Sequence, residues 1–278
     1  MDLSDHSDSG RCIKISGRAS SLLLAVNCVL RGLPLLIAAR PRTPLRAMCI
    51  MAVDLVHTLR TSQRLRVDRI RNLALWLDFA ASANADFDGK KSCPDEFHRI
   101  RGMLDDAGIG ATIDDYWTRI QELESRRPSA FGDRSQFRKV QKYREDVVRL
   151  SLGVLTTTAF GYANVDDGVR AVRTNEELQM LFRIVMQCQI IDDVMDFAND
   201  SAMKLPGFLT ASESLLESFE LTHYTARCYA SHQGLAQIGN LFPLRIALFT
   251  ASAMTKLFIT LGRWRQRIPL VQPLPELR

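Results

Sequence analysis

The chain has 278 residues, 46% of them hydrophobic, and a formal net charge of +5 at pH 7. This length and composition allow a sizeable core. The Lys and Arg residues are spread without a dense tract, which argues against nucleic-acid binding, while the mild basic excess suits an anionic substrate or a membrane surface. The six cysteines show no CxxC pairing and no zinc-site spacing, and such scattered thiols are typical of a reducing compartment.

The predicted elements, in chain order, are all helices. Residues 1–16 are polar and expected to be disordered, and residues 268–278 carry three prolines and are expected to form an extended tail. Between them, apolar stripes of helical period run through 19–38, 46–60, 66–85, 95–107, 114–125, 136–160, 166–172, 175–203, 208–232 and 240–266. No segment alternates like a strand. The sequence therefore predicts a single all-α domain, 17–267, containing about ten helices.

The apolar stretch 20–39 is nearly long enough to cross a membrane, but Asn27, Arg31, Gly32 and Pro34 interrupt it. A spanning helix needs about 20 mostly apolar residues with few charges. We therefore favour a buried helix or a cavity wall. A signal peptide is not expected, because the apolar run starts late and no small-residue cleavage site is clear. We expect a cytoplasmic protein, and peripheral contact with a membrane stays open.

Four aspartates crowd into nine positions of an otherwise apolar stretch: Asp192, Asp193, Asp196 and Asp200. On one continuous helix over 175–203, which Thr174 and Glu177 are expected to begin as a capping box, they fall within an arc of about 100°. Upstream, the same arc carries Leu178, Phe182 and Val185. The aspartates therefore continue a stripe that begins apolar and is expected to face the core.

Carboxylates on a core-directed stripe need cations nearby, because burying an unpaired charge is costly. An oxygen-rich cluster suits Mg²⁺, with Mn²⁺ as an alternative. The competing interpretation is an ordinary solvated helix face. We prefer a metal site because of the direction in which the stripe faces.

The segment QIIDDVMDFANDSAMK, residues 189–204, resembles the second aspartate-rich motif of class I isoprenoid synthases. In trans-prenyl diphosphate synthases this motif reads Q-x-x-D-D-x-x-D, followed by an Asp and a Lys, and squalene and phytoene synthases carry a related acidic motif. The resemblance implies an all-α bundle around a central apolar cavity. Acid clusters on two helices would bind Mg²⁺, which holds a prenyl diphosphate and promotes its ionisation.

Carried over residue by residue, the resemblance makes the first three of these aspartates catalytic metal ligands. Asp200 would be a ligand or would contact one. Lys204 would contact the diphosphate, with Gln189 one helical turn before the metals. The apolar part of the stripe, with Phe182 and Val185, would line the pocket for the prenyl chain.

The family also has a first acidic motif upstream, for which residues 82–91 are the best candidate. Asp86 and Asp88 are spaced i,i+2, unlike DDxxD, so metal ligation and a simple acidic turn are both open. Arg144 and Arg149 precede the aspartate cluster, and either could bind diphosphate as a bidentate donor. A solvated helix charge is the commoner role of arginine, and we favour it for both.

The sequence thus predicts a Mg²⁺-dependent prenyltransferase or terpene synthase, in which the carbocation left by diphosphate departure is coupled to a second prenyl chain or cyclised. The alternative is a synthase-like fold retained for binding or assembly without catalysis, motivated by the irregular first acidic segment. The expected partner is a prenyl diphosphate, and a homodimer is compatible with the sequence. Asp192→Asn or Asp193→Asn is expected to abolish turnover and leave the fold intact.

Overall fold

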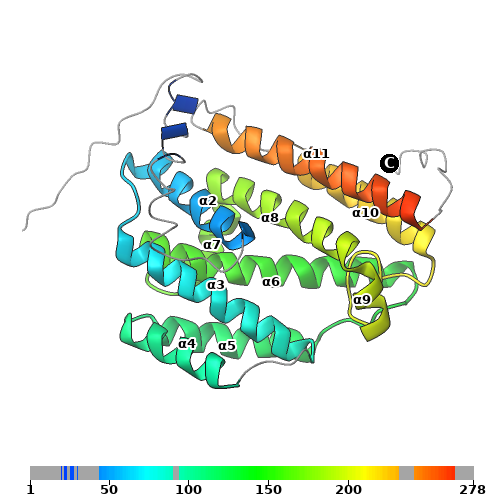
Figure 1. The fold of residues 1–278 in the computed structure, drawn as a ribbon, viewed down its shortest axis with the longest axis horizontal. Coiled ribbons are helices and arrows are strands. Elements are labelled where there is room, and N and C mark those ends of the chain that lie inside the picture. Colours follow the sequence, from blue (N-terminus) through cyan, green and yellow to red (C-terminus); the bar gives the residue numbers. More distant parts are fainter. Residues whose placement is uncertain are drawn as a thin grey trace, which may run out of the picture. The chain divides into compact units, whose positions relative to one another are not determined.

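All the regular secondary structure in the described part of the chain is helical. The computed structural model describes residues 20, 22, 23, 26, 27, 30, 44–89, 94–231 and 241–266. Within these residues lie ten labelled helices and no strand (Figure 1). In order they are α2 Pro44–Thr61, α3 Val67–Phe87, α4 Pro94–Asp106, α5 Gly110–Ser125, α6 Arg134–Phe160, α7 Val165–Thr174, α8 Glu176–Met195, α9 Phe197–Met203, α10 Leu215–Ala230 and α11 Phe242–Arg265. The all-α prediction is confirmed, whereas the predicted disordered start and extended tail lie outside the described residues.

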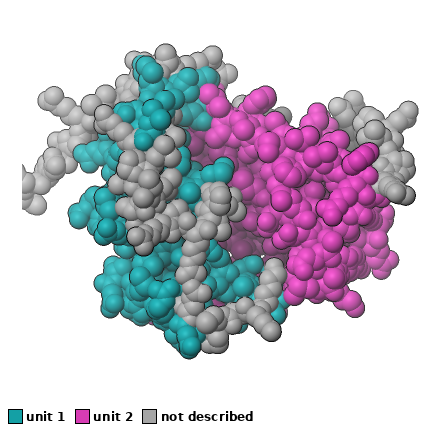
Figure 2. Space-filling model, in the orientation of Figure 1, with its two compact units in different colours: residues 1–113, 153–171, 236–243 teal, residues 114–152, 172–235, 244–278 magenta. Residues whose placement is uncertain are grey.

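The chain divides into two compact units (Figure 2). Unit 1 comprises residues 1–113, 153–171 and 236–243, and unit 2 comprises residues 114–152, 172–235 and 244–278. The predicted domain boundaries at residues 17 and 267 stay predictions.

Unit 1 has an aromatic core formed by α3 and its neighbours. Trp76 and Phe79 of α3 are fully buried and stack on each other, and Phe79 also contacts Phe97 of α4. In the same unit α6 and α7 approach very closely, because a Cβ on Gly168 would lie 2.3 Å from the carbonyl oxygen of Gly153. Glycine at these two positions is therefore what lets the two helices touch.

Unit 2 is organised around α8, which packs against α10 and α11. Gln187 of α8 is completely buried and donates from Nε2 to the carbonyl of Ala226 (2.8 Å) and to Oγ of Ser252 (3.2 Å). The hydroxyl of Thr255 donates to the Gln187 carbonyl at 3.2 Å. These bonds satisfy polar groups far from water and tie three helices together.

The predicted helix 175–203 is wrong in two respects. It is interrupted at Asp196 (φ −91°, ψ 5°), which ends α8 and precedes α9. It begins after Asn175, which has an extended backbone, whereas Thr174 is the last helical residue of α7. Because an N-cap must lie outside the helix, Thr174 cannot cap α8 and the predicted capping box is not formed.

The segment 20–39 was expected to be buried. Its described residues are helical and exposed, among them Leu23 and Leu30. For these residues the prediction of a buried helix is wrong, and the rest of the segment lies outside the described residues.

Candidate functional site

The four aspartates at the junction of α8 and α9 do not share one environment. Asp192 and Asp196 are exposed, whereas the side chains of Asp193 and Asp200 are buried, with 3% and 8% exposure. The prediction that all four face the core is therefore wrong. Asp192 and Asp193 both lie on α8, where successive side chains point about 100° apart, so Asp193 points into unit 2 while Asp192 points to solvent.

Asp193 is bonded through both carboxylate oxygens. Nη2 of Arg144, on α6, donates to Oδ1 at 3.0 Å, and the backbone N–H of Phe208 donates to Oδ2 at 2.6 Å. A Cβ on Gly207 would lie only 2.8 Å from Oδ2, so the backbone reaches this carboxylate because residue 207 has no side chain. Asp193 thus joins α8, α6 and the loop after α9.

The electrostatics of Asp193 follow from this position. Burial raises the pKa of Asp193 above its ordinary value, and Arg144 and the Phe208 amide oppose the rise by stabilising the carboxylate. The nearby charges of Asp192 and Asp196 add to the rise. A cation close to the two exposed aspartates would relieve this repulsion.

The loop that Asp193 anchors, residues 205–213, is largely buried, which is unusual for a connection. Its polar backbone groups are bonded within unit 2. The Gly207 N–H donates to Oγ1 of Thr210 at 2.7 Å, and the Phe131 N–H donates to the Thr210 carbonyl at 2.7 Å. Thr222 of α10 donates to the Phe208 carbonyl at 3.4 Å. Asp193 is one member of this set of anchors.

The two candidate arginines also have specific partners. The side chain of Arg144 is 17% exposed and pairs with Asp193, so it is not the solvated charge favoured from sequence. Arg149 donates to Oε2 of Glu145 at 2.7 Å, and its guanidinium lies over the ring of Phe182, 4.5 Å from the centroid. Arg149 is also mostly buried, so for both arginines the solvated-charge interpretation is wrong.

The remaining candidates of unit 2 lie on α8 and at the end of α9. Phe182 is buried between Arg149 and Tyr229, and Val185 and Gln189 are half-buried. Lys204 is exposed and ends α9 in a left-handed conformation with φ 54°.

Asp86 and Asp88 belong to unit 1, at the end of α3. Asp86 is exposed, while Asp88 is the half-buried C-cap and accepts a hydrogen bond from Nδ2 of Asn84 at 3.2 Å. Carboxylates at a helix C-terminus meet the negative end of the helix dipole, which a nearby cation would relieve.

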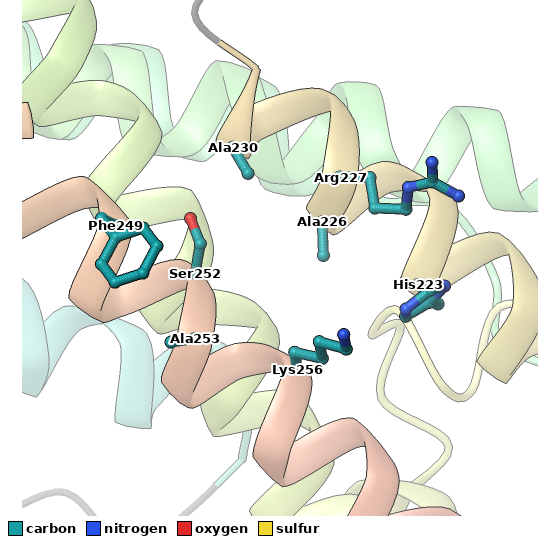
Figure 3. Close-up of a pocket in the computed structure, with 8 residues that line it drawn as sticks. All are labelled: His223, Ala226, Arg227, Ala230, Phe249, Ser252, Ala253 and Lys256. Carbon is teal, nitrogen blue, oxygen red and sulfur yellow. The ribbon is translucent and has the colours of Figure 1, made fainter.

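A groove of about 400 Å³ lies in unit 2 between α10 and α11 (Figure 3). It is lined by His223, Ala226, Arg227, Ala230, Phe249, Ser252, Ala253 and Lys256. None of the predicted site residues lines it. The sequence signals only the positive charge beside it, because α11 contains basic residues and no acidic residue.

Two further observations bear on function. Within the described ranges, no three His, Cys, Asp or Glu side chains gather closely enough to hold a metal ion by themselves. Among the same residues, α11 is the one helix that is long and apolar enough to cross a membrane, by length and composition.

In comparisons with known proteins, no family model, curated protein or solved structure matches the chain.

Proposed function

We propose that the protein is a Mg²⁺-dependent enzyme that acts on a prenyl diphosphate. The observation that carries the proposal is the pair of exposed carboxylates, Asp192 and Asp196, one helical turn apart at the end of α8. Mg²⁺ is usually held by one or two carboxylates and completes its shell with water and substrate phosphates. Two accessible aspartates fit that donor set without a third protein ligand.

In this proposal the other residues of the junction have different tasks. Asp193 is a positioning residue, because its two oxygens are bonded to Arg144 and Phe208 and fix the end of α8 against the buried loop. Asp200 and Lys204 follow on α9, where Lys204 is exposed and free to turn toward a diphosphate. Bound Mg²⁺ would neutralise charge on the leaving diphosphate.

The isoprenoid synthase fold, with a central apolar cavity for the prenyl chain, is part of the same proposal. Phe182 and Val185 precede the aspartates on α8 and are the residues expected to contact that chain. Asp86 and Asp88 would contribute a second acidic cluster from unit 1.

The test is a turnover assay with matched variants. Purified protein is incubated with Mg²⁺ and prenyl diphosphates from geranyl to geranylgeranyl, singly and in pairs, and released pyrophosphate and hydrocarbon are measured. Asp192→Asn and Asp196→Asn should lose turnover while keeping the wild-type melting temperature. The control is Asp115→Asn on α5, a half-exposed acid paired with Arg119, which should keep turnover. Absence of turnover with every substrate would reject the catalytic proposal.

A second candidate is a synthase-like fold that binds a ligand or partner without catalysis. The observation that favours it is the structural use of Asp193, whose two oxygens hold Arg144 and the buried loop. This candidate predicts that calorimetry detects binding of a prenyl diphosphate with Mg²⁺, while no pyrophosphate is released over long incubation.

A further inference from the structure

Helix α11 is apolar on two opposite sides, and only one of them faces the interior of unit 2. On the inner side Leu244, Leu248 and Ile259 are buried. Thr255, also on that side, donates to the carbonyl of Gln187 in α8. A Cβ on Gly262 would lie 3.3 Å from the ring of Phe219 in α10, so the two helices touch there. The inner side of α11 is therefore packed against α8 and α10.

The opposite side carries large hydrophobic side chains that are exposed, and we call it the outer stripe of α11. It consists of Ile246, Phe249, Met254, Leu257, Leu261 and Trp264. At 100° per residue these positions fall within an arc of about 140°, and they extend for about 27 Å along the axis. Phe249 and Trp264 are 73% and 80% exposed. Only 22% of the most apolar window of α11 is buried, unlike a core helix. An exposed apolar stripe of this length marks an interaction site.

The outer stripe is bordered by positive charge. Helix α11 contains four basic residues and no acidic residue. Arg245, Lys256 and Arg263 fall on the same edge of the stripe, within about 20° of one another. Across the groove, α10 adds Arg227, and Lys256 extends toward the imidazole of His223 (Figure 3).

The charge at this edge is felt by the imidazole of His223. Burial lowers the pKa of His223, and the positive charges of Arg227, Lys256 and Arg263 lower it further. The edge therefore attracts anions.

Three arrangements could cover the outer stripe of α11, and these features favour one of them, an anionic lipid surface. A second copy of the chain, related by a twofold axis, would place one basic α11 against another and oppose cations to cations. A helix crossing the bilayer would have to give up the inner contacts with Gln187 and Phe219. An anionic lipid surface suits both the outer stripe and its basic edge, because the apolar side chains enter the headgroup boundary while the cations contact lipid phosphates.

We propose that the outer stripe of α11 lies in the plane of a membrane that carries anionic phospholipids, with its basic edge against the lipid phosphates. Phe249 and Trp264 are the aromatic anchors, since aromatic rings favour the interfacial layer. The proposal does not depend on the catalytic function proposed above, because none of its residues belongs to the aspartate junction.

The test is co-sedimentation of the full chain with vesicles. Wild-type protein should pellet with vesicles of equal parts phosphatidylcholine and phosphatidylglycerol, and much less with phosphatidylcholine alone. The double substitution Phe249→Ser/Trp264→Ser should weaken partitioning about tenfold or more. Met103→Ser, an exposed apolar residue of α4, is the control and should bind as wild type. Lys256→Gln should weaken binding to anionic vesicles more than Lys139→Gln on α6.

A second measurement reports on the orientation without depending on these variants. Bromine-labelled acyl chains in the anionic vesicles should quench part of the tryptophan fluorescence of the wild type, and Trp264→Phe should remove that quenching. Trp76 is fully buried and should not respond.

Three results would overturn the whole proposal, and a fourth would overturn its electrostatic half. One is equal binding to neutral and anionic vesicles, and another is binding by the Phe249→Ser/Trp264→Ser protein that equals wild type. The third is a wild-type dimer that becomes a monomer in this double variant, without vesicles present, since the stripe would then be covered by a second copy. Release of bound protein by raised salt is expected, and protein that stays bound at high salt would contradict the electrostatic half of the proposal.

Discussion

The carboxylate of Asp193 is held in the interior of unit 2 by a guanidinium and a backbone amide. Its neighbour Asp192 is exposed, although the two are adjacent in sequence. Successive residues on a helix point about 100° apart, so one carboxylate reaches Arg144 and Phe208 while the other meets solvent. A buried ion pair is costly to break from one side, because the remaining charge loses its partner.

Asp193→Asn should therefore lower the free energy of unfolding by about 3 kcal/mol. The asparagine loses the negative charge that Arg144 needs and can place an NH₂ group against the Phe208 N–H. Asp192→Asn should change stability by no more than about 0.5 kcal/mol. Urea unfolding of the three proteins is the measurement. This revises the expectation from sequence that Asp193→Asn leaves the fold intact, and equal stability of the two variants would contradict the buried pair.

The carboxylate of Glu145, on α6, is also stabilised by specific hydrogen-bond partners. Its Oε1 accepts from Tyr229 (2.7 Å) and Gln141 (3.0 Å), and its Oε2 accepts from Arg149. Burial alone would raise the pKa of Glu145, but these hydrogen bonds outweigh burial and hold the pKa below its ordinary value of 4.5. A carboxyl group with a lowered pKa stabilises the folded state above its unfolded pKa, and that contribution is lost as pH falls through the folded pKa.

Tyr229→Phe should destabilise the protein by about 2 kcal/mol at neutral pH, the usual size for a hydrogen bond to a charged group. Because the bond matters most while Glu145 is ionised, the difference from wild type should shrink as the pH falls below 4.5. Urea unfolding of both proteins at a series of pH values measures this difference in the free energy of unfolding. Tyr224→Phe, at an exposed tyrosine on the same helix, is the control and should follow wild type at every pH. A difference that is constant with pH would exclude Glu145 as the partner that matters.

At the scale of elements, the connection between α9 and α10 is the least expected feature. The apolar pattern from residue 208 predicts a helix, yet α10 begins only after Ser214, whose hydroxyl accepts from the Glu217 N–H. The preceding residues form the buried loop, with Pro206 and Gly207 at its start. Proline and glycine disfavour helix here, and the apolar side chains that follow are buried without helical geometry.

Gly207→Ala should destabilise the protein by about 2 kcal/mol, because the added Cβ would lie 2.8 Å from Oδ2 of Asp193. Gly102→Ala is the matched control. Gly102 lies inside α4 with open space around it, and alanine there should stabilise by up to about 1 kcal/mol. Chemical denaturation of both variants measures whether each substitution lowers or raises the free energy of unfolding. A neutral Gly207→Ala would mean that the loop can move away from Asp193 without loss.

At the scale of the whole molecule, the two acidic segments belong to different compact units. A metal site at the aspartate junction of unit 2 can therefore be tested by itself. Binding to the folded state alone raises stability by a term that depends only on ligand concentration and affinity, so melting experiments can detect such a site without turnover.

Mg²⁺ with pyrophosphate should stabilise the wild type by about 2.7 kcal/mol at a hundred times the dissociation constant. For a chain of this length, that corresponds to a rise in melting temperature of about 5 °C. Mg²⁺ alone should do much less, because it needs phosphate oxygens to complete its shell. Asp192→Asn should remove this rise in melting temperature. Equal shifts in the wild type and in Asp192→Asn would contradict the metal site.

Local sequence determined most of the described helices, although it missed the break at Asp196 and the late start of α10. The period of apolar residues predicted helices at 46–60, 66–85 and 136–160, close to α2, α3 and α6. Helix formation depends on backbone bonds between residues four apart and on an apolar face of period 3.6, both of which are legible in a short stretch of chain. The same locality made the aspartate cluster visible, together with the absence of acids from α11.

Only the tertiary structure decided which aspartate is buried and which faces of a helix are covered. The partner of Asp193 lies 49 residues away on α6, so no local pattern reveals it. The outer stripe of α11 has the apolar character of a core face, yet its side chains are exposed because the helix already packs through its opposite side. Periodicity shows which residues share a face, whereas burial depends on which elements pack there, and that is set by contacts between residues far apart in the chain.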